Sequence, residues 1–213
     1  MSDRIIEVPM FPLGAVHFPH TPLALRLFEP RYLMMLGMLL DTPPGEFGVV
    51  LIERGRETGG GEQRFDLGTM ATLERVIPQE GVVSVLARGG SRFEVVEWLS
   101  DDPYPRARVR LLPDLEWNDA LDPLLDQAEA IVRRVLARSG EYGSTRWDPD
   151  VELAEDRLAR AWQVAAIAPL GALDQLALLR TTSIGALLSA TIDLTVAAEE
   201  LLAVRGYRPD DEP

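Results

Sequence analysis

The two histidines of the chain, His17 and His20, are the residues best suited by type to metal binding or acid–base chemistry. Spaced by three, they could supply two ligands to a metal ion that an acidic residue completes, or one could be the base of a Ser–His–Asp triad. They flank Phe18-Pro19 in an irregular, proline-bound segment and do not share a helix face. We therefore interpret both as turn or surface-strand residues and expect neither a metal site nor a catalytic residue.

Lysine is absent from the sequence, and all 21 basic residues are arginine. A Walker A loop needs a lysine at the β- and γ-phosphates of its nucleotide. A Ser–Lys dyad needs an amine that can lose its proton, a role that arginine cannot fill. The 213 residues therefore contain neither site. Cysteine is also absent, which excludes disulfides, thiolate metal ligands and cysteine nucleophiles within this sequence.

The segment Gly89-Gly90-Ser91-Arg92 combines glycines, a hydroxyl and a cation, as some phosphate-binding loops do. No G-x-S-x-G nucleophile elbow occurs in the sequence. We interpret the segment as a glycine-rich hairpin turn between strands at 82–88 and 92–98, because tight turns favour glycine. No cofactor is expected.

Composition and charge exclude several classes of protein. With 46% hydrophobic and 26% charged residues, the chain can form one large or two small globular domains. Its net charge of −13 argues against nucleic-acid binding, which depends on clustered basic residues. No apolar run reaches the ~18 residues typical of a membrane span, and residues 1–4 lack the pattern of a signal peptide. We expect a cytoplasmic protein without a membrane partner.

Alternating apolar and polar residues predict strands through the first half of the chain. In the strand predicted at 22–28, Leu23, Leu25 and Leu27 alternate with Ala24 and Arg26. Further strands are predicted at 4–8, 47–53, 69–77, 82–88, 92–98 and 106–112. A helix from Pro30 to Leu40 interrupts them, since proline suits the first helical position. Many strands with one helix among them predict a mostly antiparallel sheet or open barrel.

Helical periodicity replaces this alternation in the second half. Apolar residues between Leu121 and Leu136 recur at i, i+3, i+4 and i+7, which predicts a long amphipathic helix, followed by a loop at 139–149. Further helices are predicted around Trp162, from Asp174 to Arg180, and from an N-cap at Ser183 to Gly206. The expected organisation is a β unit with one helix at 1–115, a helical unit at 116–208 and a disordered tail at 209–213.

Several short motifs follow one another in a fixed order: Phe11-Pro12-Leu13, Phe18-Pro19, Phe28-Glu29-Pro30-Arg31-Tyr32, Gly68-Thr69-Met70-Ala71 and Arg88-Gly89-Gly90-Ser91-Arg92-Phe93. Together they resemble the N-terminal, substrate-binding domain of the Lon protease family, over roughly residues 5 to 205. His20 departs from the family, which usually has glycine after Phe-Pro. The residues expected to carry the motif structurally are Pro12, Pro19, Glu29, Pro30, Arg31, Gly89, Arg92 and Phe93, with Glu29 and Arg31 as an ion pair.

This resemblance implies an α+β fold, in which a mainly antiparallel, PUA-like β pseudo-barrel precedes an α-helical bundle. It also implies a non-catalytic recognition module that binds unfolded or apolar peptide segments or a protein partner. Because the sequence lacks the ATPase and peptidase motifs, we expect a stand-alone recognition domain, which acts with a separate ATPase or protease or independently of one.

The binding surface is expected to include Phe18, Phe28, Tyr32, Met35 and Met38, with Met35 and Met38 as the likelier exposed methionines of their helix. Aromatic rings and flexible methionines suit apolar partners of varied sequence. Addition of a peptide strand to a barrel edge is one expected binding mode. Two alternatives remain open: a regulatory domain that binds a small molecule, and a hydrolase whose site the sequence does not reveal.

Overall fold

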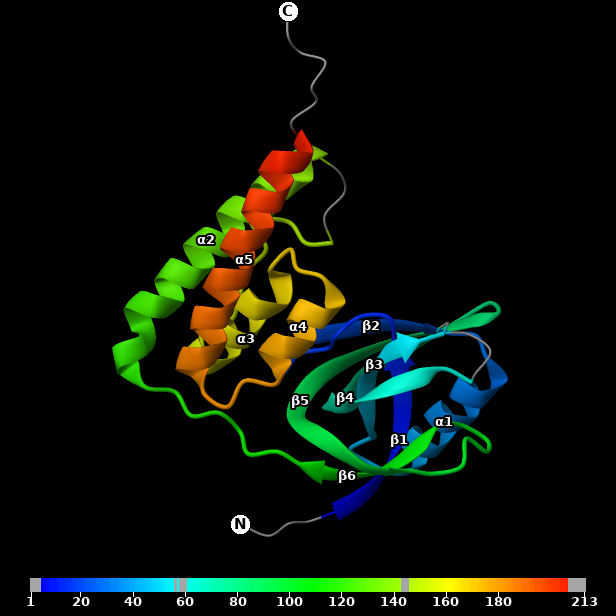
Figure 1. The fold of residues 1–213 in the computed structure, drawn as a ribbon. Coiled ribbons are helices and arrows are strands. Elements are labelled where there is room, and N and C mark those ends of the chain that lie inside the picture. The colour runs from blue at the N-terminus through cyan, green and yellow to red at the C-terminus, as the bar shows by residue number, and fades with distance from the viewer. Residues whose placement is uncertain (1–4, 56, 58–60, 143–145, 207–213) are drawn as a thin grey trace, which may run out of the picture. The chain divides into compact units, whose positions relative to one another are not determined.

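The computed structural model describes residues 5–55, 57, 61–142 and 146–206, and the chain divides into two compact units. The barrel unit, Met1–Asp114, contains six strands and one helix, and the helical unit, Leu115–Pro213, contains the remaining helices (Figure 1). The predicted α+β class is therefore confirmed. The tail predicted to be disordered, 209–213, lies outside the described residues.

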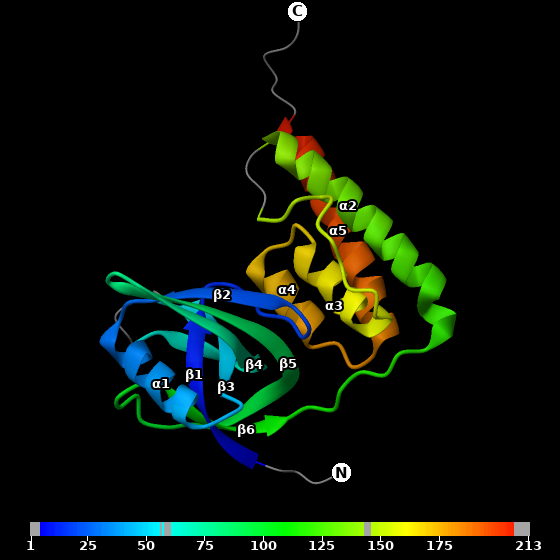
Figure 2. The same ribbon diagram turned by 180° about the vertical axis from the view of Figure 1, so that it is seen from behind.

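The six strands of the barrel unit form one sheet. They are β1 (Ile5–Leu13), β2 (Pro22–Leu27), β3 (Glu46–Arg54), β4 (Gln63–Gln79), β5 (Val82–Trp98) and β6 (Arg106–Leu111). Their order is β2-β5-β4-β3-β1-β6, and β5 also pairs with β6, so five strands close into a ring with β2 attached to β5 (Figure 2). Strands β1 and β3 pair in parallel and the other pairs are antiparallel, as a mainly antiparallel pseudo-barrel requires.

The hairpin turn predicted at Gly89-Gly90 is wrong, because β5 continues through it as a single strand of 17 residues. The chain instead turns between β4 and β5 at Gly81, whose positive φ of 76° suits glycine. Gly89 serves a close backbone approach: its N–H donates to the carbonyl of Thr21 at 3.0 Å, and a Cβ there would lie 2.1 Å from the carbonyl oxygen of Phe18. The strands predicted at 82–88 and 92–98 are therefore one strand. Gly89 lies where the backbone of Phe18 approaches that strand closely.

Apolar side chains fill the barrel unit in two clusters. One contains Met10, Val50, Phe93 and Val109 and lies among the strands alone. The other joins Leu23, Leu25, Leu27, Phe47 and Val49 to the buried side of the helix α1 (Pro30–Asp41). The predicted helix is therefore present, and it packs against the strands through one side.

The helical unit contains a 3-10 turn η1 (Asp119–Leu121) and the helices α2 (Asp122–Tyr142), α3 (Arg157–Ile167), α4 (Ala172–Leu179) and α5 (Ile184–Gly206). Helix α2 continues to Tyr142, into the first residues of the loop predicted at 139–149. Gly171, not Asp174, is the N-cap of α4, so Asp174 lies inside its first turn. The predicted cap at Ser183 is confirmed, since its Oγ accepts a hydrogen bond from the N–H of Ala186 at 3.1 Å.

Candidate functional site

Helix α1 exposes large apolar side chains on the side that does not pack on the barrel. We define the α1 outer face as Phe28, which precedes the helix, with Leu33, Met34, Gly37 and Leu40. Phe28, Met34 and Leu40 are 58%, 51% and 55% exposed. Scattered exposed apolar residues are ordinary, but a contiguous group of them usually marks an interaction site. The α1 outer face is therefore the candidate functional site.

The helical period explains why this face is apolar. Tyr32, Met35, Leu36 and Leu39 recur at i, i+3, i+4 and i+7 and form the buried side of α1. The intervening positions turn outward, and in a typical surface helix they would be polar. Here the sequence Leu-Met-Met-Leu-Gly-Met-Leu-Leu supplies apolar residues or glycine at every position from Leu33 to Leu40. One side of the helix therefore packs in the core, and the other is exposed among the described residues.

A hollow of about 290 Å³ adjoins the C-terminal end of the α1 outer face. Leu40 belongs to both, and the hollow is otherwise lined by apolar residues such as Pro43 and Leu73 together with the charged Glu74 and Arg75. Because Leu40 connects the two, an apolar side chain bound on the helix has a neighbouring recess available.

The N-terminal corner of α1 is fixed by polar contacts. The expected ion pair is present, with Arg31 Nε 3.1 Å from Glu29 Oε2, and the Arg31 guanidinium lies 4.4 Å above the ring of Tyr32. Burial raises the pKa of the Tyr32 hydroxyl, and Glu62 and Glu29 add to this effect while Arg31 opposes it. These contacts hold Tyr32 as a neutral, buried anchor for the helix, and Phe28 precedes this corner in the chain.

Three of the five predicted binding residues are not on the surface. Phe18, Tyr32 and Met35 are 1–3% exposed and belong to the core, so the prediction that they line the binding surface is wrong. Phe28 is exposed, and Met38 is partly buried against the core. Leu33, Met34 and Leu40 are exposed but were not among the predicted binding residues. The helical phase set by the buried positions would have found them, but a stretch apolar at almost every position does not reveal which phase applies.

Residues 7–197 match the family model described as the ATP-dependent protease La (LON) substrate-binding domain. The chain belongs to this Lon family. It is 29% identical over 170 residues to Lon protease 2 of Herpetosiphon aurantiacus and 26% identical over 141 residues to Lon protease of Syntrophomonas wolfei. These matches cover 78% and 64% of this chain but 20% and 16% of those proteins. The chain therefore spans about a fifth of the length of the Lon proteases that it matches.

Two solved structures agree with this assignment. The Lon N-terminal domain protein from Xanthomonas campestris superposes with a TM-score of 0.58 at 25% identity, covering 93% of this chain and 98% of that one. The N-terminal domain of Mycobacterium avium complex Lon protease superposes with a TM-score of 0.64 at 16% identity, covering 90% and 98%. The second likeness shows a shared fold, and the first also shows detectable sequence similarity.

His20, where the chain departs from the Lon motif, has a backbone conformation that favours glycine. His20 has a φ of 59°, in the left-handed region that glycine adopts without strain. Glycine, which the resemblance implies at this position, therefore suits the conformation better than the histidine present here. His17 is buried, and its Nδ1 lies 3.3 Å from the Thr21 hydroxyl. Among the described residues, no group of three or more acidic or histidine side chains could hold a metal ion.

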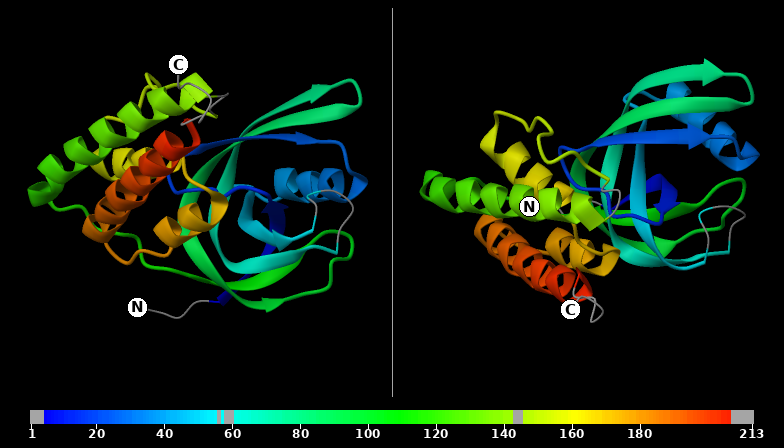
Figure 3. Two further views of the ribbon diagram at one scale, coloured as in Figure 1. Left: turned by 45° about the horizontal axis from the view of Figure 1, so that its top comes forward. Right: turned by 90° about the horizontal axis from the view of Figure 1, so that it is seen from above.

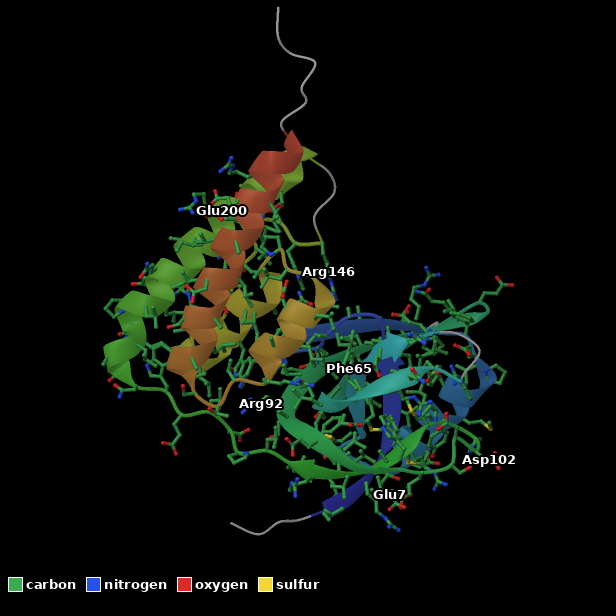
Figure 4. The ribbon with its side chains drawn as sticks, viewed as in Figure 1. Glu7, Phe65, Arg92, Asp102, Arg146 and Glu200 are labelled. Carbon is green, nitrogen blue, oxygen red and sulfur yellow. The ribbon has the colours of Figure 1, made fainter. Side chains whose placement is uncertain are left out.

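The remaining motif residues have structural roles in the barrel unit. Pro12, Pro19 and Phe93 are buried, and Pro30 begins α1 as expected. Arg92, labelled in Figure 4, projects from β5 and donates from Nη2 to the carbonyl of Pro113 at 3.2 Å.

In the parts of the chain that the structure describes, no helix is long and apolar enough to cross a membrane.

A second hollow, of about 500 Å³, lies in the helical unit beside Trp117, Asp156 and Arg157. Its two arginines already have partners. Arg157 Nη2 lies 2.9 Å from Asp122 Oδ2, and Arg160 Nη2 lies 2.6 Å from Glu129 Oε2. A ligand at this hollow would have to compete with those ion pairs. The hollow therefore gives less support to a small-molecule site than the α1 outer face gives to a protein-binding surface.

Proposed function

We propose that this Lon-family domain binds exposed apolar segments of unfolded or partly unfolded proteins on the α1 outer face. One observation carries the proposal: a helix anchored by its buried side presents Leu33, Met34 and Leu40 to solvent, with the exposed Asp41 as the charged residue at its end. The substrate-binding description of the matched family supports it.

The chemistry of this face suits partners of varied sequence. Methionine is flexible and polarizable, so Met34 can adapt to side chains of different shape. Burying one such side chain contributes about 1.5–3 kcal/mol before the entropy of ordering the partner is subtracted. We therefore expect affinities on the order of micromolar, which suits the capture and release of many substrates.

Cleavage of a bound substrate requires groups that these 213 residues do not contain. The sequence has no lysine, so nucleotide hydrolysis at a Walker A loop and peptide cleavage by a Ser–Lys dyad need other protein segments. We propose that the domain contributes recognition and that any ATPase or protease acts on what it has bound.

The test is binding of a fluorescent apolar-aromatic peptide and of a permanently unfolded model protein, measured by polarisation. We expect the double substitution Leu33→Asp with Met34→Asp to weaken binding about tenfold or more, because both apolar contacts are replaced by hydrated charges. A matched control places the same charge change on exposed positions of α2, as Ala130→Asp with Ala137→Asp. Equal affinity of the two double variants, both folded, would refute the proposal.

A further inference from the structure

Among the residues that the structure describes, β2 leaves one edge of the sheet without a partner strand. In the sheet order β2-β5-β4-β3-β1-β6, the other terminal strand, β6, returns to pair with β5, whereas β2 pairs with β5 alone. That pairing covers all six residues from Pro22 to Leu27 without a register shift. Figure 3 shows β2 beside β5 in the barrel unit. An uninterrupted strand with one unpaired edge is a template for a further strand.

The register identifies the backbone groups on that edge. Residues of an antiparallel pair alternate between hydrogen-bonded and non-hydrogen-bonded positions. Gly89 N–H donates to the Thr21 carbonyl at 3.0 Å, which places Thr21, and hence Leu23, Leu25 and Leu27, in the positions that bond to β5. The N–H and C=O groups of Ala24 and Arg26 therefore point away from β5. Pro22 is also at an outward-facing position, so its missing N–H costs no hydrogen bond between β2 and β5.

These groups have no partner among the described residues. No hydrogen bond to the outward backbone groups of Pro22, Ala24 or Arg26 is present in the described ranges, and all three residues are exposed. Two N–H donors and three carbonyl acceptors thus follow one another at strand spacing. The chemistry that satisfies such a row is the backbone of an extended polypeptide.

We infer that β2 accepts an extended segment of the substrate polypeptide as an additional strand, which deepens the proposed function and rests on it. Phe28 directly follows β2 and belongs to the α1 outer face, so the strand edge and the apolar face are continuous along the chain. Backbone pairing is independent of side-chain identity, and the apolar face selects segments that are hydrophobic. Together they describe a site for unfolded chains of varied sequence.

Charge favours this occupant over a second copy of the chain. The net charge of −13 makes two copies repel each other. Arg26 is exposed on β2 and makes no ion pair within the described residues. An acidic side chain opposite it on the added strand would therefore be favourable, whereas a second β2 running antiparallel would bring another arginine to the same edge.

The first test uses the peptide of the polarisation assay in a series with one backbone N-methyl group at each position in turn. Strand addition predicts a period of two: methylation of alternate residues, whose N–H groups face β2, weakens binding about tenfold, and methylation of the others has little effect. Loss of binding that is independent of parity, with the unmethylated peptide bound normally, would overturn the inference and leave the proposed function intact. Failure of every peptide to bind would overturn the proposed function and the inference with it.

Hydrogen exchange of the wild-type protein is the second test and does not depend on a variant that folds. The amides of Ala24 and Arg26 should exchange fast in the free protein and become protected when the peptide is bound. Those of Leu25 and Leu27 should be protected in both states, since they bond to β5. Unchanged exchange at Ala24 and Arg26 with peptide bound would reject strand addition. Protection that appears with protein concentration alone, together with dimers in sedimentation, would assign the edge to a second copy and also reject it.

Discussion

Helices α1 and α2 use apolar residues in opposite ways. Helix α2 buries Leu125, Val132 and Val135 and exposes polar groups such as Asp126 and Arg134, as an amphipathic surface helix does. Helix α1 buries a similar stripe, but it exposes apolar residues on the opposite side. The need to bury apolar side chains accounts for the residue pattern on both sides of α2, but only for the buried side of α1.

Charge pairing distinguishes α1 from the rest of both units. In the helical unit, Glu199 of α5 lies 2.9 Å from Arg134 and 2.7 Å from Arg138 on α2, and in the barrel unit Arg108 lies 2.8 Å from Glu97 across β5 and β6. Among the described residues, the exposed side of α1 has no such pair, and β2 keeps one edge unpaired. Features that do not contribute to the fold of the barrel unit gather around α1 and β2, and we take that as the mark of its function.

The largest expected effect separates the two sides of α1. Met35→Asp should destabilise the barrel unit by about 3 kcal/mol or more, because it removes a core side chain and introduces a carboxylate where Met35 is 1% exposed. Met34→Asp, one residue earlier and 51% exposed, should change stability by less than about 0.5 kcal/mol. Urea unfolding followed by circular dichroism measures both. Similar losses from the two substitutions would show that the assigned helical phase is wrong.

A second contrast concerns glycine. Gly89→Ala places a Cβ 2.1 Å from the carbonyl oxygen of Phe18, and we expect a loss of about 1–3 kcal/mol in unfolding free energy. Gly37→Ala meets nothing within 4 Å on the α1 outer face and should stabilise the helix by up to about 1 kcal/mol. Thermal unfolding of the two variants is the measurement. A stable Gly89→Ala protein would contradict the close approach of β5 to the segment before β2.

The barrel unit should lose stability at alkaline pH. Burial raises the pKa of Tyr32 above that of an unfolded tyrosine, about 10. The neutral hydroxyl is favoured in the folded state, so its contribution is complete below pH ~10 and is lost as the pH rises toward the raised pKa. Tyr32→Phe should flatten the fall in unfolding free energy above about pH 10, where unfolded tyrosine ionises while folded Tyr32 stays neutral. An unchanged slope in this variant would assign the alkaline loss to other groups.

The smallest effect concerns the helical unit at acid pH. Hydrogen bonds from Arg134 and then Arg138 lower the pKa of Glu199. The stabilisation is therefore present at neutral pH and is lost as the pH falls through the lowered pKa. Glu199→Gln should reduce the acid dependence of stability slightly and leave the alkaline dependence unchanged. A titration of Glu199 by NMR that gives an ordinary pKa would remove the basis for this expectation.

Much of the fold could be predicted from local patterns. Alternation in Leu23, Leu25 and Leu27 placed β2, and the helical period between Leu121 and Leu136 placed α2, because each element buries one face. The continuity of β5 could not be predicted. Gly89-Gly90 has the chemistry of a turn, and only the approach of a distant segment at Phe18 explains glycine inside a strand.

The candidate site was predicted in part. The sequence indicated that the helix after Pro30 matters and that Phe28 contributes. It did not indicate which of Met34 and Met35 is exposed. Both sides of the helix are apolar, so the helical period does not show which side faces the core. The phase is set by packing, in which Tyr32, Met35 and Leu39 contact the strands.

The sequence by itself determined that these residues contain no Walker A loop and no Ser–Lys dyad, that a strand-rich half precedes a helical half, and which family the chain resembles, since these depend on residue types and local spacing. Tertiary structure decided which apolar side chains are exposed and which backbone groups lack a partner strand. Whether an apolar residue of α1 is core or surface, and whether an edge of β2 is paired, depends on segments that are distant in sequence and meet only in the folded protein.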